Sequence, residues 1–199
     1  MPRFLGYVRT STETLSPGYF SMVMATGIMS LAAHLMGPAW LAIALLVLNW
    51  LLFISIGALA LAHLHWHPKR VLADLFSHHT APGFFTFVAA CSILGSQSLL
   101  IGRSLPMAVM LAGVALLAWV VITYTIFTVL TVKREKPTLD KGINGGWLLA
   151  VVSTQAMAVI AALISQYVDQ PLRLEMNFFA LSMWLWGGML YIWLMSLIF

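Results

Sequence analysis

Six long apolar runs dominate the sequence and restrict what it can fold into. Each has about 20 or more residues, the length that an α-helix needs to cross the hydrocarbon core of a bilayer. The runs are residues 17–36, 39–62, 82–101, 106–132, 143–165 and 177–199. The alternating segments that are typical of a membrane β-barrel are not found. We therefore predict an all-α, polytopic membrane protein, with a short segment 1–15 followed by a transmembrane domain over 16–199.

The charged residues lie between the runs. Only 8% of the residues are charged and 61% are hydrophobic, whereas soluble domains carry roughly 25% charged residues. One side of the predicted membrane domain collects eight basic residues, namely Arg3, Arg9, Lys69, Arg70, Lys133, Arg134, Lys136 and Lys141. The other side has only Arg103 and Arg173. The positive-inside rule then places the N-terminus on the cytoplasmic side of the cell (inner) membrane. The net charge of +4 therefore reflects topology and not nucleic-acid binding.

The chain repeats itself. "SPGYFSMV" stands at residues 16–23 and "APGFFTFV" at residues 81–88. Gly83 follows Gly18 by 65 residues, and Gly146 follows Gly83 by 63. A period of about 64 residues with two runs per period indicates three helical hairpins in parallel repeat. The helix-start motif of the odd-numbered runs consists of Pro17, Gly18, Pro82, Gly83, Gly145 and Gly146.

Polar side chains gather in the odd-numbered runs, whereas the even-numbered runs are almost uniformly apolar. This contrast predicts odd helices inside, around a shared axis, and even helices toward lipid. The predicted pore-lining residues are Thr26, Ser30, Thr86, Cys91, Ser92, Ser153, Thr154 and Gln155. Thr26, Cys91 and Thr154 each lie eight residues after a repeat glycine and form one predicted layer. An alternative stays open, because Ser and Thr also bond to their own backbone or to a neighbouring helix. Likewise, the Pro-Gly pairs could simply be helix-start signals.

Titratable side chains give little sign of chemistry inside the membrane. No Asp or Glu lies near the centre of a run, which argues against a carboxylate proton relay or a cation site. Five histidines cluster near the end of the second run: His63, His65, His67, His78 and His79. His63 and His67 have a spacing that can hold a metal ion, so a membrane-embedded metalloenzyme is one alternative. Leu75 stands where a second histidine box would need His. We therefore favour interfacial histidines, and predict no metal site, no cofactor and no enzyme activity.

Three segments resemble a known family. They are "SPGYFSMVMATGIMSLAAHL", "APGFFTFVAACSILGSQ" and, most specifically, "GINGGWLLAVVSTQAMAVIAALIS". They are similar to the tellurite-resistance/dicarboxylate transporter family, which includes malate permeases, sulfite efflux proteins and, more distantly, plant slow anion channels. The resemblance covers residues from about 16 to 199. It implies ten helices as five hairpins in quasi-fivefold order, with odd helices around a central pore. It also implies small anions as substrates (C4-dicarboxylates, sulfite or other oxyanions) and trimeric assembly.

The sequence departs from this pattern in having three hairpins and not five. The pore-occluding phenylalanine of the family lies on the ninth helix, so no gate residue can be assigned here. We expect a transporter or channel for small anions, or the N-terminal part of one. A non-transporting, truncated assembly partner is the other alternative. The expected partners are a small anion, the lipid bilayer and further copies of the chain, and not nucleic acid.

Overall fold

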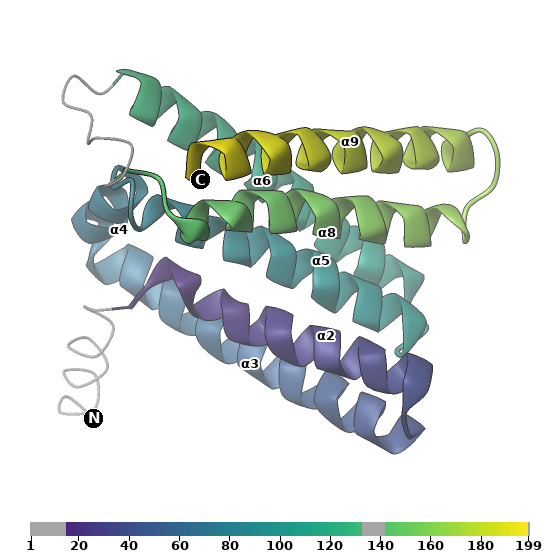
Figure 1. Ribbon diagram of the computed structural model, residues 1–199. Coiled ribbons are helices and arrows are strands. Elements are labelled where there is room, and N and C mark those ends of the chain that lie inside the picture. The colour runs from purple at the N-terminus through teal and green to yellow at the C-terminus, as the bar shows by residue number, and fades with distance from the viewer. Residues whose placement is uncertain (1–14, 133–141, 199) are drawn as a thin grey trace, which may run out of the picture.

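The computed structural model describes residues 15–132 and 142–198, and within these ranges it contains helices and turns but no strand (Figure 1). In this part of the chain, six helices are long and apolar enough to cross a membrane. This confirms the predicted fold class, an all-α polytopic membrane protein.

Each odd-numbered span begins with a 3₁₀ turn that continues into an α-helix. The first is η1 (Pro17–Phe20) followed by α2 (Ser21–Met36), the second is η2 (Ala81–Phe84) followed by α5 (Phe85–Leu100), and the third is η3 (Gly145–Trp147) followed by α8 (Leu148–Ser165). The even-numbered spans are single helices, α3 (Ala39–Trp66), α6 (Leu105–Val132) and α9 (Leu172–Ile198). The helix-start motif therefore occupies the same structural position in each repeat.

The six spans form three antiparallel hairpins, α2–α3, α5–α6 and α8–α9 (Figure 1). Short turns join the two helices of each pair. In the first, the N–H of Gly37 bonds to the carbonyl of Ala33 and ends α2, and Pro38 then precedes α3. In the second, Arg103 takes a left-handed conformation with φ of 50°, which reverses the chain within a few residues.

Burial separates the two kinds of span. In the most apolar part of each odd span, 33%, 78% and 56% of the residues are buried, in chain order. The corresponding shares for α3, α6 and α9 are 11%, 17% and 17%. Neighbouring hairpins meet mainly through α2, α5 and α8. The odd helices therefore form the inside of the bundle, and the even helices lie on its outside, where lipid is the expected solvent.

Two helical regions extend beyond the apolar runs. α3 continues to Trp66, and the short helix α4 (Pro68–Leu75) follows it directly. α9 begins at Leu172, five residues before the last apolar run, and includes Arg173 and Glu175. Hydropathy detects only the part of a helix that meets hydrocarbon. The backbone can continue as a helix through the interface, where polar side chains reach water.

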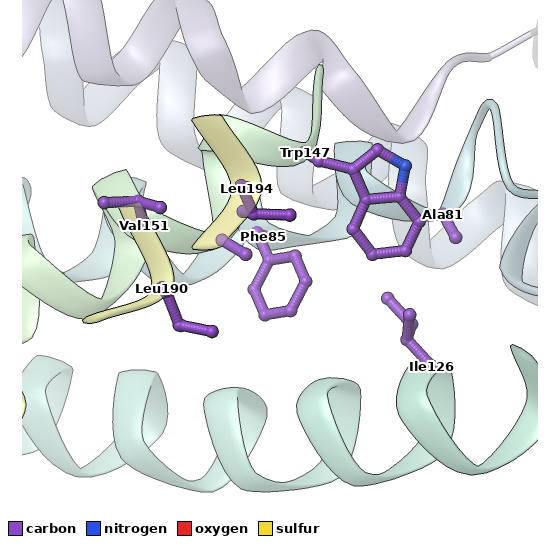
Figure 2. Packing of buried hydrophobic residues seen from close by; sticks show 8 residues of the cluster. Ala81, Phe85, Ile126, Trp147, Val151, Leu190 and Leu194 are labelled. Atoms are coloured by element: carbon purple, nitrogen blue, oxygen red, sulfur yellow. The ribbon is translucent and has the colours of Figure 1, made fainter. Parts of the chain in front are cut away.

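Aromatic and aliphatic side chains join the second and third hairpins near the odd-helix starts. Phe85 and Trp147 are buried in a cluster with side chains from α6, α8 and α9 (Figure 2). The indole Nε1 of Trp147 donates to the carbonyl of Gly142 at 3.1 Å, which satisfies its polar atom in an apolar setting. This cluster fixes the ends of two odd helices beside each other.

Candidate functional site

The three odd helices begin side by side at one end of the bundle. Two starts are capped by a side chain: Ser16 Oγ accepts from the N–H of Gly18 at 3.3 Å, and Asn144 Oδ1 accepts from the N–H of Gly146 at 2.8 Å. Such caps satisfy backbone donors that a helix start leaves free. The middle start is held differently. Thr86 Oγ1 lies 2.7 Å from the carbonyl oxygen of Gly83 and 3.0 Å from that of Pro17 in the preceding repeat.

Gly83 lies at the close contact between the first two starts. A Cβ atom at Gly83 would lie 3.1 Å from the backbone nitrogen of Gly18 and 3.4 Å from the ring of Pro17, so a larger residue would push the two turns apart. η2 also contacts η3, which carries Gly145 and Gly146. The structure thus brings the helix-start motif together at one end. The aligned helix starts give that end a partial positive charge, which favours anions.

Several of the predicted pore-lining residues form hydrogen bonds to backbone carbonyls, either across helices or within their own helix. Ser30 Oγ donates to the carbonyl of Ala42 in α3 at 2.8 Å, and Gln155 Nε2 donates to that of Trp184 in α9 at 3.1 Å. Ser92 and Ser153 donate to the carbonyls of Val88 and Ala150 in their own helices. These bonds are the alternative role of such side chains in membrane helices. That these residues line a pore stays a prediction.

The layer of Thr26, Cys91 and Thr154 is not uniform. Thr154 is fully buried, and its hydroxyl accepts from Trp119 Nε1 of α6 at 2.9 Å and lies 2.8 Å from the carbonyl oxygen of Ala150. Cys91 is also fully buried, in a cluster with Ala115 of α6 and other apolar side chains. Thr26 is partly exposed. Two of the three positions therefore contact the even helix α6.

Six apolar residues recur at the repeat spacing in the odd helices, and four of them pack where these helices meet. They lie six and ten residues after each repeat glycine and define two apolar layers: Met24, Ala89 and Val152 in one, and Ile28, Ile93 and Ala156 in the other. Met24, Ala89, Ile93 and Ala156 share one apolar cluster that joins α2, α5 and α8. Val152 and Ile28 are exposed. The spacing from the repeat glycines could have identified these positions. Apolar residues, however, do not stand out in helices that are apolar throughout.

A buried amide pair ties the first two hairpins together. Asn49 of α3 donates through Nδ2 to Gln97 Oε1 of α5, and both side chains are fully buried. Their other amide atoms, Asn49 Oδ1 and Gln97 Nε2, have no hydrogen-bond partner in the described part of the chain. Hydrogen bonds between membrane helices of this kind are stabilising, because the surroundings offer little competition.

The histidines do not assemble a metal site in the part of the chain that the structure describes. No three His, Cys, Asp or Glu side chains come together there in a metal-binding arrangement. The rings of His63 and His67 have centroids 5.7 Å apart and are tilted against each other. The metalloenzyme alternative therefore finds no supporting geometry in these residues.

These features define a multi-pass α-helical membrane protein whose repeated hairpins place three uncharged odd spans side by side. The model of the voltage-dependent anion channel family matches residues 14–199. The chain belongs to this family, which confirms the resemblance found in the three sequence segments and makes it an anion channel or transporter by class. Neither the curated proteins nor the solved structures include a significant match to this sequence.

Proposed function

We propose that the chain forms a path for small anions of the C4-dicarboxylate, sulfite or oxyanion type, along the axis that the odd spans share. The observation that carries this proposal is the alignment of the three helix starts η1, η2 and η3 at one end of the bundle. Their partial positive charges attract an anion without a fixed cationic side chain.

The odd spans are electrically neutral along their length. Residues 17–36, 81–100 and 145–165 contain no Lys, Arg, Asp or Glu. An anion in such a path is not held by a permanent countercharge, so it can leave as readily as it enters. Selectivity then comes from the width of the path and from the helix starts.

In this proposal the two apolar layers set the width of the path. Ile93 and Ala156 are repeat-equivalent and belong to one cluster with Met24 and Ala89. Thr26, which is partly exposed, adds a polar contact to the path. The other polar candidates form its wall: Ser30, Thr86, Cys91, Ser92, Ser153, Thr154 and Gln155. In this proposal the protein lies in the inner membrane with its N-terminus on the cytoplasmic side. Copies of the chain associate, and the family resemblance implies a trimer.

Flux measurements in proteoliposomes test the proposal with labelled malate, sulfite and nitrate. The informative variant is Ala156→Phe, which enlarges a partly buried side chain in the apolar layer. Its matched control is Ala44→Phe, at an exposed position of α3. We expect Ala156→Phe to lower the flux by about tenfold or more, because a misplaced bulky group raises the barrier by more than about 1.4 kcal/mol. The Ala44→Phe variant should transport as the wild type does.

Two results would contradict the proposal. One is unchanged flux in a folded, inserted Ala156→Phe protein. The other is the absence of flux for every anion of the panel with wild-type protein of correct mass and monodisperse elution. Thr26→Leu and Thr154→Leu extend the test to the polar layer, where a loss of flux without a loss of insertion supports a place on the path.

A further inference from the structure

A deep apolar groove lies between α3 and α6 on the outside of the bundle. It has a volume of about 490 Å³, within the range of about 300–1,000 Å³ that is usual for ligand pockets. Its floor includes Phe84 and Phe87 at the start of the second odd span. Its walls include Phe53, Gly57 and Leu61 of α3 and Met110, Val114 and Ile122 of α6. Both walls belong to the least buried spans, so the groove opens where lipid is expected.

The polar side chains of the groove gather at one end. Ser16, His63 and Asp74 line it where η1, the last turns of α3 and α4 meet. His63 is only 6% exposed, and neither of its ring nitrogens has a hydrogen-bond partner among the described residues. An imidazole that is buried without a partner costs free energy. A polar group of a ligand at this end would reduce that cost.

The length of the groove matches one leaflet of a bilayer. Met110 and Ile122 are twelve residues apart on α6, which corresponds to about 18 Å at the rise of an α-helix. Half of the hydrocarbon core of a bilayer is about 15 Å thick. The α6 wall of the groove is therefore long enough for one acyl chain, and the polar end formed by Ser16, His63 and Asp74 is where the chain's ester would lie.

We propose that this groove binds an acyl chain of a phospholipid from the surrounding bilayer, with the ester and phosphate region at His63. The lipid would fill apolar space whose lining side chains otherwise lack contacts on one side. Because it would touch α3 and α6 together, it would brace the first hairpin against the second. The groove opens toward lipid between two even helices, whereas the proposed anion path runs among the odd helices.

Gly57 makes the groove testable. A Cβ atom at Gly57 would meet no heavy atom within 4 Å, and the same is true of Gly113 on α6. Gly57 lines the groove, whereas Gly113 is exposed and does not. Gly57→Phe therefore fills the groove without a clash near the backbone, and Gly113→Phe is its matched control at the lipid-facing surface.

The experiment uses full-length protein in phosphatidylcholine liposomes that contain a little phosphatidylglycerol with a photoreactive acyl chain. After illumination, the adducts are mapped by mass spectrometry. We expect them to concentrate in residues 53–64 and 110–122. Gly57→Phe should lower these adducts about tenfold, since several methylene groups lose their buried contacts. Gly113→Phe should leave them unchanged.

His63→Leu tests the polar end separately. Replacing part of the phosphatidylcholine by a diacylglycerol without phosphate should raise the groove adducts of the probe, because the diacylglycerol competes less well for the polar end. His63→Leu should remove this rise while the groove adducts persist. Equal competition by the two lipids with wild-type protein would overturn the role of His63.

The groove site is overturned by adducts spread evenly over α3, α6 and α9, or by unchanged groove adducts in Gly57→Phe. It is also overturned if the groove residues form cross-links to a second copy of the chain and not to lipid. Should Gly57→Phe fail to elute as folded protein, the smaller substitution Gly57→Leu takes its place. Fewer groove adducts in that variant support the site, and unchanged groove adducts contradict it. None of these readouts depends on anion flux.

Discussion

At the scale of single residues, the bond from Trp119 to Thr154 joins the second hairpin to the third. The donor and acceptor are 2.9 Å apart, and Thr154 is fully buried. Thr154→Val keeps the shape of the side chain but leaves the indole N–H without its acceptor. We expect the free energy of unfolding to fall by about 0.6–2 kcal/mol, the range for hydrogen bonds between membrane helices. Unfolding in a detergent titration measures this change.

A double-mutant cycle with Trp119→Phe isolates the bond from the change in packing. The coupling between the two sites should be of similar size, about 0.6–2 kcal/mol, because each variant alone already removes the interaction. Ser55→Ala is the control, since its hydroxyl bonds to the carbonyl of Leu51 within the same helix. Additive effects of the two variants would show that the bond contributes nothing to stability.

The sequence showed that polar residues recur in the odd spans, but it did not predict which side chains they contact. Thr154 stood out because a hydroxyl is rare in an apolar run and recurs at the repeat spacing. Its partner Trp119 belongs to a different hairpin, and a contact between hairpins depends on packing that no local pattern records. The same holds for Asn49 and Gln97, 48 residues apart in the chain.

At the scale of elements, the close packing of α2 against α3 and α5 depends on Gly27. A Cβ atom there would clash with the side chain of Ile93, and would lie 3.0 Å from Asn49 Nδ2 and 3.2 Å from Gln97 Oε1. Gly27→Ala should therefore lower the free energy of unfolding by about 1–3 kcal/mol, the usual cost of overpacking. Gly113→Ala should be neutral or slightly stabilising, because Ala favours a helix over Gly by about 1 kcal/mol.

Thermal unfolding of the purified variants measures the difference. Adding Ile93→Leu to Gly27→Ala should recover part of the loss, since leucine lacks the Cγ2 methyl group of Ile93 that the new Cβ atom would meet. If Gly27→Ala proved as stable as Gly113→Ala, the two hairpins would be packed less closely than the structure shows.

The spans themselves followed from the sequence because hydropathy is a local property. The repeat fixed which helices begin at the same end. The 3₁₀ starts and α4 could not be predicted in this way. The start of the second span rests on Thr86 bonding across to Pro17 of another repeat. α4 is short and contains both charged and apolar residues, so its apolar side chains are too few to show a helical periodicity.

At the scale of the whole molecule, the arrangement of the spans makes a prediction about orientation. α4 and the starts of the odd helices lie at one end of the bundle, and the α8–α9 turn lies at the other (Figure 1). The excess of Lys and Arg on the first side predicts that this end faces the cytoplasm. Cysteine labelling tests this with Ala73→Cys in α4 and Gln166→Cys in the α8–α9 turn, both at exposed positions.

A membrane-impermeant maleimide should label Gln166→Cys in intact spheroplasts and Ala73→Cys only after the membrane is opened. Both substitutions leave the charged residues in place, so they do not disturb the signal that sets the topology. The wild type is the built-in control, because its single cysteine, Cys91, is fully buried and should stay unlabelled in both conditions. Labelling of Ala73→Cys in intact spheroplasts would reverse the orientation. The aligned helix starts would then face the periplasm, and an anion would meet the partial positive charges on entry from outside.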